Sequence, residues 1–233
     1  FLICISVYFN YKPGKTYFMN NQSNLGFLLV DDHSLVLQIC EQLIHKNFPN
    51  AKITVSTTIE DFINTSKQQK FDMIIMDLYL QDGNSINVFN VIKVLQDTAK
   101  FLFFSMYPDN VYGKRLLQMG ADGYLNKAAD SAEFLKAIDI ILHDGKYLSQ
   151  NLRIALAQDA IDKREKNPFD QLAEREFEIL LLLLSGKSIS EISIDLNLHL
   201  STVSTYKARL FSKLNVKSVI ELNQLAYTYG LIH

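Results

Sequence analysis

The sequence predicts two domains of different class: an α/β domain built on a doubly wound five-stranded parallel sheet, followed by a small all-α domain. Three observations lead to this prediction. The length of 233 residues is about one and a half times that of a typical domain. From Gly26 onward, short apolar runs alternate with amphipathic stretches of helix length. Beyond a polar stretch interrupted by Pro168, the pattern is helical throughout and contains no strand-like run.

The composition is that of a globular protein. Hydrophobic residues make up 48% of the chain and charged residues 21%, which excludes a disordered or collagen-like chain. The net charge of −2 is too balanced to indicate a nucleic-acid or membrane coat by itself. The two cysteines, Cys4 and Cys40, are far apart, so we expect neither a disulfide framework nor a cysteine metal site. We therefore expect the cytoplasm as the compartment, and no membrane partner.

The N-terminal residues are treated separately. Phe1 to Phe9 is apolar but far shorter than the roughly 18 residues that indicate a membrane span. It also lacks the basic region and the cleavage site of a signal peptide. Since the first methionine is Met19, we interpret residues 1–18 as upstream sequence and residues 1–25 as a non-native or disordered extension. A truncated membrane anchor is the competing interpretation.

The apolar runs are predicted strands. They are continuous rather than alternating, which is typical of a parallel sheet covered by helices on both faces. The predicted strands are Phe27–Val30, Ile53–Val55, Met73–Met76, Phe101–Phe104 and Tyr124–Leu125. Apolar residues at helical spacing predict helices between them. These stretches are Ser34–His45, Ile86–Leu95, Val111–Met119 and Ser131–Leu142.

The second domain is predicted to contain a helix-turn-helix. Residues 158–170 are polar and charged, which indicates a linker. After a helix through Ile179–Leu184, Ser188 and Glu191 form a capping box that opens a short helix. Asn197 then tolerates the left-handed conformation of a tight turn. Two further helices follow, at Ser201–Leu214 and Val219–Tyr227. Two short helices joined by a tight turn match the helix-turn-helix pattern.

Polar side chains follow four of the predicted strands. Asp31 and Asp32 follow the first strand, Asp77 the third, Ser105 the fourth and Lys127 the fifth. In a parallel sheet these ends share one edge, where sites of such folds form. Crowded carboxylates favour a hard divalent cation such as Mg²⁺. One carboxylate could then attack a phosphoryl group and form an acyl phosphate, with the hydroxyl and the ammonium binding the phosphoryl oxygens.

The charge of the second domain is uneven. From Leu196 to Ser218 there are four basic residues and no acidic one. These residues are Lys207, Arg209, Lys213 and Lys217. An acid-free basic stretch within an acidic protein indicates a partner more clearly than total charge does. On charge alone, however, a solvated helix face is the favoured explanation.

The motifs of both predicted domains resemble those of a known family. Residues 26–148 resemble a response-regulator receiver domain, which has a flavodoxin-like fold, through LLVDDH, MIIMDLYL, FLFFSMY and GADGYLNK. Residues 172–231 resemble the LuxR-type helix-turn-helix domain through LAEREFEIL, GKSISEISIDLNL and STVSTYKARLFSKLNV. Together they resemble the NarL/FixJ group, and STVSTYKARL suggests the branch that includes BvgA and EvgA. We set the boundaries at 26–148 for the receiver, 149–170 for the linker and 171–233 for the DNA-binding domain.

The resemblance implies roles for these residues. Asp77 is the phosphoacceptor, Asp31 and Asp32 bind Mg²⁺ with it, and the Tyr79 backbone carbonyl is a further ligand. Ser105 and Lys127 sense the phosphoryl group, and Tyr124 is the aromatic that reorients with Ser105. The implied partners are a sensor histidine kinase and duplex DNA, with a homodimer as the active form. The chain departs from the family at Gln81, where proline is usual, at Ser85, where glycine is usual, and at Ala128, where proline is usual.

The second helix of a helix-turn-helix enters the major groove. Helical spacing places Val203, Leu210 and Leu214 toward the domain core. Seven other residues of the helix are assigned to DNA: Thr202, Ser204, Thr205, Lys207, Ala208, Arg209 and Lys213. Small hydroxyls and an alanine read bases weakly by hydrogen bonding, so thymine-methyl contacts and DNA shape are expected to add to specificity.

Two other functions compete with a phosphorylation-switched transcription factor. A phosphohydrolase with an aspartate nucleophile normally needs a second carboxylate two residues later, and that position is Tyr79. A DNA-binding regulator independent of phosphorylation would not need the complete acidic site. We therefore expect a regulator and not an enzyme. Tyr79 and Tyr107 are also predicted to rim the site and to slow hydrolysis of the acyl phosphate.

Overall fold

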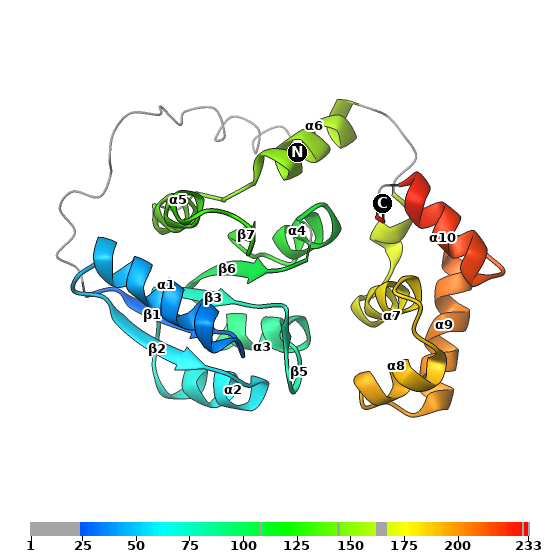
Figure 1. Ribbon diagram of the computed structural model, residues 1–233, viewed down its shortest axis with the longest axis horizontal. Helices are drawn as coiled ribbons and strands as arrows, with labels where there is room; N and C mark the ends of the chain where they lie inside the picture. Colours follow the sequence, from blue (N-terminus) through cyan, green and yellow to red (C-terminus); the bar gives the residue numbers. More distant parts are fainter. Residues whose placement is uncertain (1–23, 108, 144, 162–166, 230, 233) are drawn as a thin grey trace.

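The computed structural model describes residues 24–107, 109–143, 145–161, 167–229 and 231–232. Residues 1–18, which we interpreted as upstream sequence or as a truncated membrane anchor, lie outside the described residues. Figure 1 shows an α/β domain and a helical domain, with helix α7 of the helical domain on the side that faces the sheet domain.

The first domain is built on a five-stranded parallel sheet with the order β2-β1-β3-β6-β7. Its strands are β1 (Gly26–Val30), β2 (Lys52–Ser56), β3 (Met73–Met76), β6 (Lys100–Ser105) and β7 (Gly123–Asn126). Val30 at the end of β1 pairs with Met76 at the end of β3, and Ser105 pairs with Asn126. The carboxyl ends of the strands are therefore aligned, as predicted for a doubly wound sheet.

Helices cover both faces of this sheet (Figure 1). They are α1 (Ser34–Asn47), α2 (Ile59–Gln68), α3 (Ile86–Leu95), α4 (Asp109–Gln118) and α5 (Ser131–Leu142). Phe27 and Leu29 of β1 pack in one core with α1 and α5, whereas Leu28 and Val30 pack in the other with α2, α3 and α4. Successive strand residues thus enter opposite cores, which explains the continuous apolar runs.

Three elements of the structure were not predicted. One is helix α2, and another is a hairpin of β4 (Tyr79–Leu80) and β5 (Gly83–Asn84) directly after Asp77. The third is α6 (Gln150–Ile161), a helix inside the stretch 149–170 that we expected to be a linker. Helix α6 packs on α4, where a Cβ at Gly113 would lie 2.8 Å from Leu152 Cδ2. Gly113 therefore allows the close approach of these two helices.

The second domain is helical, as predicted. It comprises a short 3₁₀ helix, η1 (Pro168–Gln171), and helices α7 (Glu174–Leu184), α8 (Ile189–Asp195), α9 (Leu200–Leu214) and α10 (Val219–Thr228). The predicted capping box of Ser188 and Glu191 opens α8. Asn197 takes the predicted left-handed conformation, with φ of 50°, in the turn between α8 and α9. These features confirm the helix-turn-helix.

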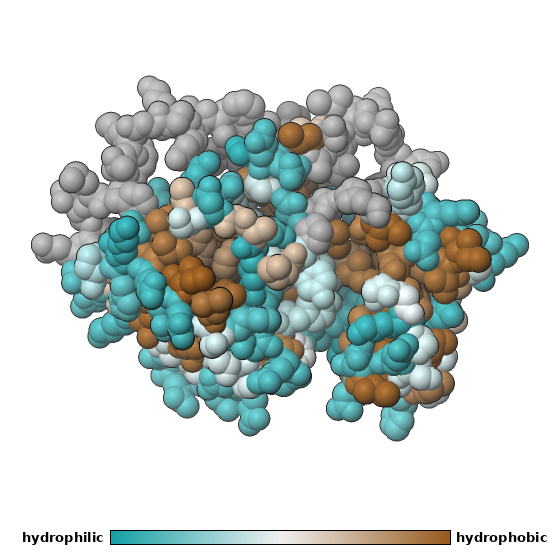
Figure 2. Space-filling view, in the orientation of Figure 1, coloured by the Kyte–Doolittle hydropathy of each residue, from teal (hydrophilic) through white to brown (hydrophobic). Residues whose placement is uncertain are grey.

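The surface combines hydrophilic side chains with several apolar patches on both domains (Figure 2). Exposed large apolar residues include Leu35 on α1, Val94 on α3, and Ile220 and Tyr227 on α10. Within the described residues, no helix combines the length and the apolar character that crossing a membrane requires.

Candidate functional site

The carboxyl edge of the sheet brings together the five side chains that the strand ends predicted. Lys127 Nζ lies 2.6 Å from Asp31 Oδ2 and 2.6 Å from Asp77 Oδ2. Ser105 Oγ donates a hydrogen bond of 2.5 Å to Asp77 Oδ1, and the backbone N–H of Leu78 donates one of 2.6 Å to the same oxygen. Both carboxylate oxygens of Asp77 are therefore engaged by groups able to bind a phosphoryl oxygen instead.

The electrostatics of the site centre on Lys127. Its side chain is only 4% exposed, and burial alone would lower its pKa. The hydrogen bonds to Asp31 and Asp77 outweigh the burial, so the pKa of Lys127 is raised and the ammonium stays charged. The Lys127 ammonium thus bridges two carboxylates. The local charge remains negative, because these two carboxylates outweigh one ammonium and Asp32 lies beside them.

The carboxylates also fit a divalent metal ion. Ligand atoms of Asp31, Asp32, His33 and Asp77 all lie within 4.8 Å of one another. Asp32 Oδ1 is buried without a hydrogen-bond partner among the described residues, although His33 Nδ1 lies 2.7 Å away. A buried carboxylate oxygen without a donor is suited to a hard cation, and a mostly carboxylate set favours Mg²⁺. The residues present therefore fit Mg²⁺. The histidine was not among the predicted ligands.

Aromatic residues surround the phosphoacceptor. Tyr124 is fully buried, and its hydroxyl donates a hydrogen bond of 2.7 Å to the Tyr107 carbonyl oxygen. The Tyr107 ring packs on the Tyr79 ring at 5.1 Å, and the Tyr79 hydroxyl shares a hydrogen bond of 2.9 Å with Tyr112 on α4. Burial raises the pKa of Tyr79, so its phenol stays protonated and cannot act as a base.

The loop after Asp77 is the β4–β5 hairpin, and its geometry accommodates serine at position 85. Ser85 takes helical backbone angles, with φ of −66°, and so does not require glycine. Its hydroxyl donates to the carbonyl oxygens of Asp77 and Leu78 at 2.5 and 3.1 Å. Gly83 adopts the positive φ of the segment, 157°, and Gln81 lies in the turn of the hairpin. Within this hairpin the backbone conformation that favours glycine therefore occurs at Gly83 and not at position 85.

The second candidate site is helix α9. Val203, Leu210 and Leu214 are buried in the domain core, as predicted. Thr205, Ala208 and Arg209 are exposed on the opposite side, and Thr202, Ser204 and Lys207 are half-buried. The hydroxyls of Ser204 and Thr205 donate to the backbone carbonyls of Leu200 and Ser201, each at 2.9 Å. Because these bonds use the hydroxyl protons, the two oxygens have lone pairs left to accept a hydrogen bond.

Two of the basic residues on α9 have partners within the domain. Lys207 Nζ lies 5.2 Å from the centre of the Phe211 ring, where its stem packs while its charge stays near the surface. Lys213 Nζ lies 2.6 Å from Glu176 Oε2 on α7. Sequence reasoning missed this ion pair, because Glu176 is 37 residues away in the chain.

A parallel sheet of this order with an Asp–Lys–Ser cluster at its carboxyl edge, joined to a helix-turn-helix, defines a signalling protein that binds DNA. Comparison with known proteins agrees. Residues 27–139 match the response regulator receiver domain family, and residues 170–226 match the bacterial regulatory proteins of the luxR family.

Individual relatives span nearly the whole chain. The response regulator UvrY of Escherichia coli K12 is 31% identical over 212 residues, covering 89% of this chain and 95% of UvrY. GacA of Pseudomonas viridiflava is 29% identical over 206 residues, covering 88% of this chain and 96% of GacA. A structure of the Salmonella typhimurium RcsB response regulator matches with a TM-score of 0.66 at 20% identity, covering 89% of this chain and 98% of RcsB. The chain belongs to the response regulators that join a receiver domain to a LuxR-type DNA-binding domain, and it is a transcription regulator.

Proposed function

We propose that Asp77 accepts a phosphoryl group from a sensor histidine kinase in the presence of Mg²⁺, and that this modification switches DNA binding. A carboxylate oxygen of Asp77 attacks the phosphorus, the bond from phosphorus to the kinase histidine breaks, and the departing imidazole takes up a proton. The observation that supports this most directly is that Lys127 and Ser105 contact different oxygens of Asp77.

Each residue of the site has a role in this reaction. Lys127 and Ser105 transfer their hydrogen bonds from Asp77 to the phosphoryl oxygens and so stabilise the developing charge. Asp31, Asp32 and Asp77 would hold Mg²⁺, together with the Tyr79 carbonyl that the family resemblance implies. Bound by these residues, Mg²⁺ would offset the negative charge of the carboxylates and of the incoming phosphoryl group. Tyr124 follows Ser105 because its hydroxyl is tied to the loop that carries Tyr107.

For the DNA-binding domain we propose that α9 enters the major groove. Thr202, Ser204, Thr205 and Ala208 are assigned to base edges and nearby backbone; Lys207, Arg209 and Lys213 are assigned to phosphates. A homodimer on duplex DNA is proposed because one small module offers limited contact area. Solved relatives include an RcsB–DNA complex and two RcsB dimers bound to two parallel DNAs.

The proposal also covers the cellular compartment, the branch of the family and the domain boundaries. We place the chain in the cytoplasm as a regulator and not an enzyme, and in the branch that includes BvgA and EvgA on the basis of STVSTYKARL. The proposed domain boundaries are 26–148, 149–170 and 171–233. A phosphohydrolase is disfavoured because Tyr79 stands where its acid/base carboxylate would be, and the phenol is bonded to Tyr112.

The phosphorylation proposal is tested by intact mass after incubation with a small-molecule phosphodonor and Mg²⁺. Wild type and Asp97→Ala, which alters an exposed carboxylate outside the site, should gain one phosphoryl group, whereas Asp77→Ala should not. An equal gain in Asp77→Ala would show that the assignment is wrong. DNA binding that is unaffected by a confirmed gain of phosphate would favour the alternative regulator that acts independently of phosphorylation.

A further inference from the structure

The β4–β5 hairpin is fastened to the rest of the molecule at three points. Ser85 Oγ bonds to the backbone carbonyl of Asp77 at 2.5 Å. The Asp82 carboxylate accepts two hydrogen bonds, of 2.9 and 2.8 Å, from the backbone N–H of Ile59 at the start of α2. Asn84 Nδ2 donates a bond of 3.0 Å to Glu178 Oε1, which belongs to α7 of the DNA-binding domain. The loop that follows the phosphoacceptor is thus held partly by the other domain.

The bond between Asn84 and Glu178 is buried and specific. Asn84 uses both ends of its amide, since its Oδ1 accepts a bond of 2.9 Å from the Ile86 N–H. The Glu178 side chain is only 4% exposed, and its other oxygen accepts a bond of 2.6 Å from Arg175. A buried carboxylate must keep its donors, because an unsatisfied charged group is costly to bury. The position of Asn84 is therefore fixed by Glu178.

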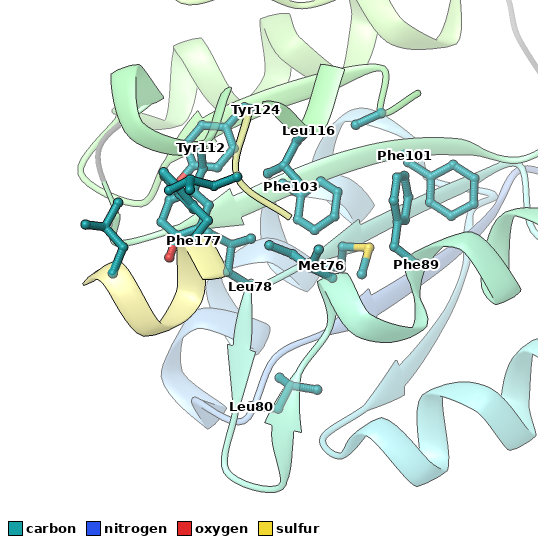
Figure 3. Close-up of a cluster of buried hydrophobic side chains, with 14 of the residues drawn as sticks. Met76, Leu78, Leu80, Phe89, Phe101, Phe103, Tyr112, Leu116, Tyr124 and Phe177 are labelled. Atoms are coloured by element: carbon teal, nitrogen blue, oxygen red, sulfur yellow. The ribbon is translucent and has the colours of Figure 1, made fainter. Parts of the chain in front are cut away.

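Aromatic packing shields this contact. Tyr112 on α4 meets the Phe177 ring on α7 edge-on at 5.8 Å, and the Arg115 guanidinium lies 5.0 Å from the same ring. Figure 3 shows Tyr112, Tyr124 and Phe177 gathered at one end of the buried cluster, with Leu78 beside them. A small cavity lined by Tyr79, Asn84, Tyr112 and Glu178, among others, has room for about a single water molecule. Hydrogen bonds in such poorly solvated surroundings are strengthened.

Asn84 and Ser85 are neighbours in the chain, so the two fastenings are mechanically linked. Glu178 fixes Asn84, and the next residue fixes the backbone carbonyls of Asp77 and Leu78. The Leu78 N–H in turn bonds to Asp77 Oδ1. A continuous path of short bonds therefore leads from α7 to the carboxylate of the phosphoacceptor.

We propose that Glu178 is a positioning residue for the Mg²⁺ and phosphorylation site, acting through Asn84. The inference rests on the proposed function of Asp77. It assigns a purpose to the serine at position 85, which departs from the family pattern, because this serine ties the hairpin to Asp77 while its neighbour Asn84 ties the hairpin to the other domain. Coupling of this kind is reciprocal, so Mg²⁺ at the carboxylates must also favour docking of α7.

The test measures Mg²⁺ binding to the full chain by titration calorimetry. Glu178→Leu removes the acceptor and should weaken Mg²⁺ binding about fivefold, at the lower end of the usual range for coupled sites. Glu178→Gln keeps an acceptor for Asn84 and should bind like wild type. The matched control is Glu174→Gln, since Glu174 lines the same small cavity, whereas the carboxylate that accepts the Asn84 bond is that of Glu178.

A swapped pair separates positioning from a simple change of charge. Asn84→Asp keeps the acceptor for the Ile86 N–H but sets two carboxylates against each other, and it should weaken Mg²⁺ binding. Adding Glu178→Gln lets the glutamine amide donate to the new aspartate, which reverses the direction of the original bond. The doubly substituted chain should therefore bind Mg²⁺ with the wild-type dissociation constant. A charge effect alone would strengthen binding of the cation in Asn84→Asp and leave the doubly substituted chain, which has the wild-type net charge, unexplained as a rescue; stronger binding in Asn84→Asp would overturn the proposal.

The reciprocal effect gives a second readout. Mg²⁺ should slow amide hydrogen exchange along 174–184 in wild type and not in Asn84→Asp, which alters only the receiver. Equal Mg²⁺ binding by wild type, Glu178→Leu and Asn84→Asp would overturn the positioning role while leaving the site itself intact. A wild-type chain that binds no Mg²⁺ would instead remove the proposed function on which the inference rests.

Discussion

Lys213 on the recognition helix α9 forms an ion pair of 2.6 Å with Glu176 on α7. The same Glu176 oxygen accepts a bond of 2.8 Å from the Ala173 N–H, which closes the start of α7. Burial alone would raise the pKa of Glu176, but the bonds from Lys213 and Ala173 outweigh it and the pKa is lowered. Lys213 therefore fastens the recognition helix to the helix that also contacts the receiver domain.

The first prediction concerns stability. Lys213→Met should lower the free energy of unfolding of the DNA-binding domain by about 1–2 kcal/mol at neutral pH, because the buried Glu176 carboxylate loses its cation and keeps only the bond from the Ala173 N–H. The loss of stability should be modest because the Lys213 side chain is 40% exposed and solvent screens its charge. Urea denaturation of the full chain, followed by helical circular dichroism, measures this loss. Lys217→Met, in the same basic stretch, is the control and should show none.

The pH dependence of this loss follows from the lowered pKa of Glu176. A carboxyl group with a lowered folded-state pKa stabilises the protein above its unfolded-state pKa, and this contribution disappears as the pH falls through the folded-state value. The difference between wild type and Lys213→Met should therefore shrink as the buffer is taken down through about pH 4. A difference that is constant with pH would contradict the ion-pair explanation.

The second prediction concerns contact with DNA. Arg209→Ala should reduce the slope of log affinity against log salt by about one unit, since Arg209 is exposed on α9 and a lost phosphate contact has this effect. Lys207→Ala should act in the same direction, because its charge lies at the surface beside Phe211. Lys67→Ala on α2 controls for net charge. Unchanged affinity and slope in both α9 variants would remove this helix from the DNA interface.

Lys213 makes the same experiment more informative. Because its ammonium is held by Glu176, Lys213→Met should change the salt slope less than Arg209→Ala does. This outcome would correct the original assignment of Lys213 to DNA phosphates. A full unit of slope lost in Lys213→Met would instead show that the ion pair opens on DNA.

The sequence predicted the sheet because its signals are local. Continuous apolar runs identified the five strands, and the residues after them identified the edge where Asp77, Ser105 and Lys127 meet. Asn197 and the Ser188 capping box likewise depend on neighbouring residues only. Such features can be predicted because backbone geometry and burial dictate them without knowledge of the tertiary contacts.

The features that sequence reasoning missed depend on distant partners. The hairpin after Asp77 is held by Glu178, which is 94 residues from Asn84. The sequence marked this loop as unusual through Gln81 and Ser85, but it could not indicate which part of the protein compensates. The helix inside the expected linker was overlooked because its residues are mixed in polarity, and its packing depends on Gly113 in α4.

The third prediction concerns the charge balance of the site. Lys127 pairs with both Asp31 and Asp77 in the absence of metal and offsets part of their charge, so Lys127→Ala leaves three carboxylates crowded together without a cation. Mg²⁺ should then bind about tenfold more tightly, because a repelling cation has been removed and the carboxylates attract the ion more strongly. Phosphoryl transfer to Asp77 should nevertheless fall, since a stabilising group for the phosphoryl oxygens is lost.

Calorimetry and phosphoryl incorporation measure these two effects separately. Lys146→Ala is the control, because Lys146 pairs with Asp122 beyond the opposite ends of the strands. If Lys127→Ala weakened Mg²⁺ binding, the ammonium would have to support the metal site, and its role as the metal-free counter-ion would be wrong.

The last prediction concerns the lifetime of the acyl phosphate. Tyr107 is 43% exposed and packs against the Tyr79 ring at 5.1 Å, which places both rings together beside the phosphoacceptor. The pKa of Tyr107 is raised by burial first and then by the charge of Asp77, so its phenol stays protonated and cannot activate water. We therefore predict that both rings exclude the in-line water that hydrolysis needs.

Tyr107→Ala should accelerate phosphoryl decay roughly tenfold, which corresponds to about 1.4 kcal/mol in activation free energy. Tyr79→Asn should accelerate the decay as well, because this variant removes the other ring of the pair. Tyr79→Phe is the sharp control: it keeps the ring and removes only the hydroxyl that bonds to Tyr112, so the decay rate should remain that of wild type. The decay is followed by intact mass at fixed Mg²⁺. If decay were no faster in Tyr107→Ala and Tyr79→Asn, the shielding explanation would be wrong. If Tyr79→Phe also decayed faster, the long lifetime would depend on the hydrogen bond between Tyr79 and Tyr112 on α4 and not on the ring.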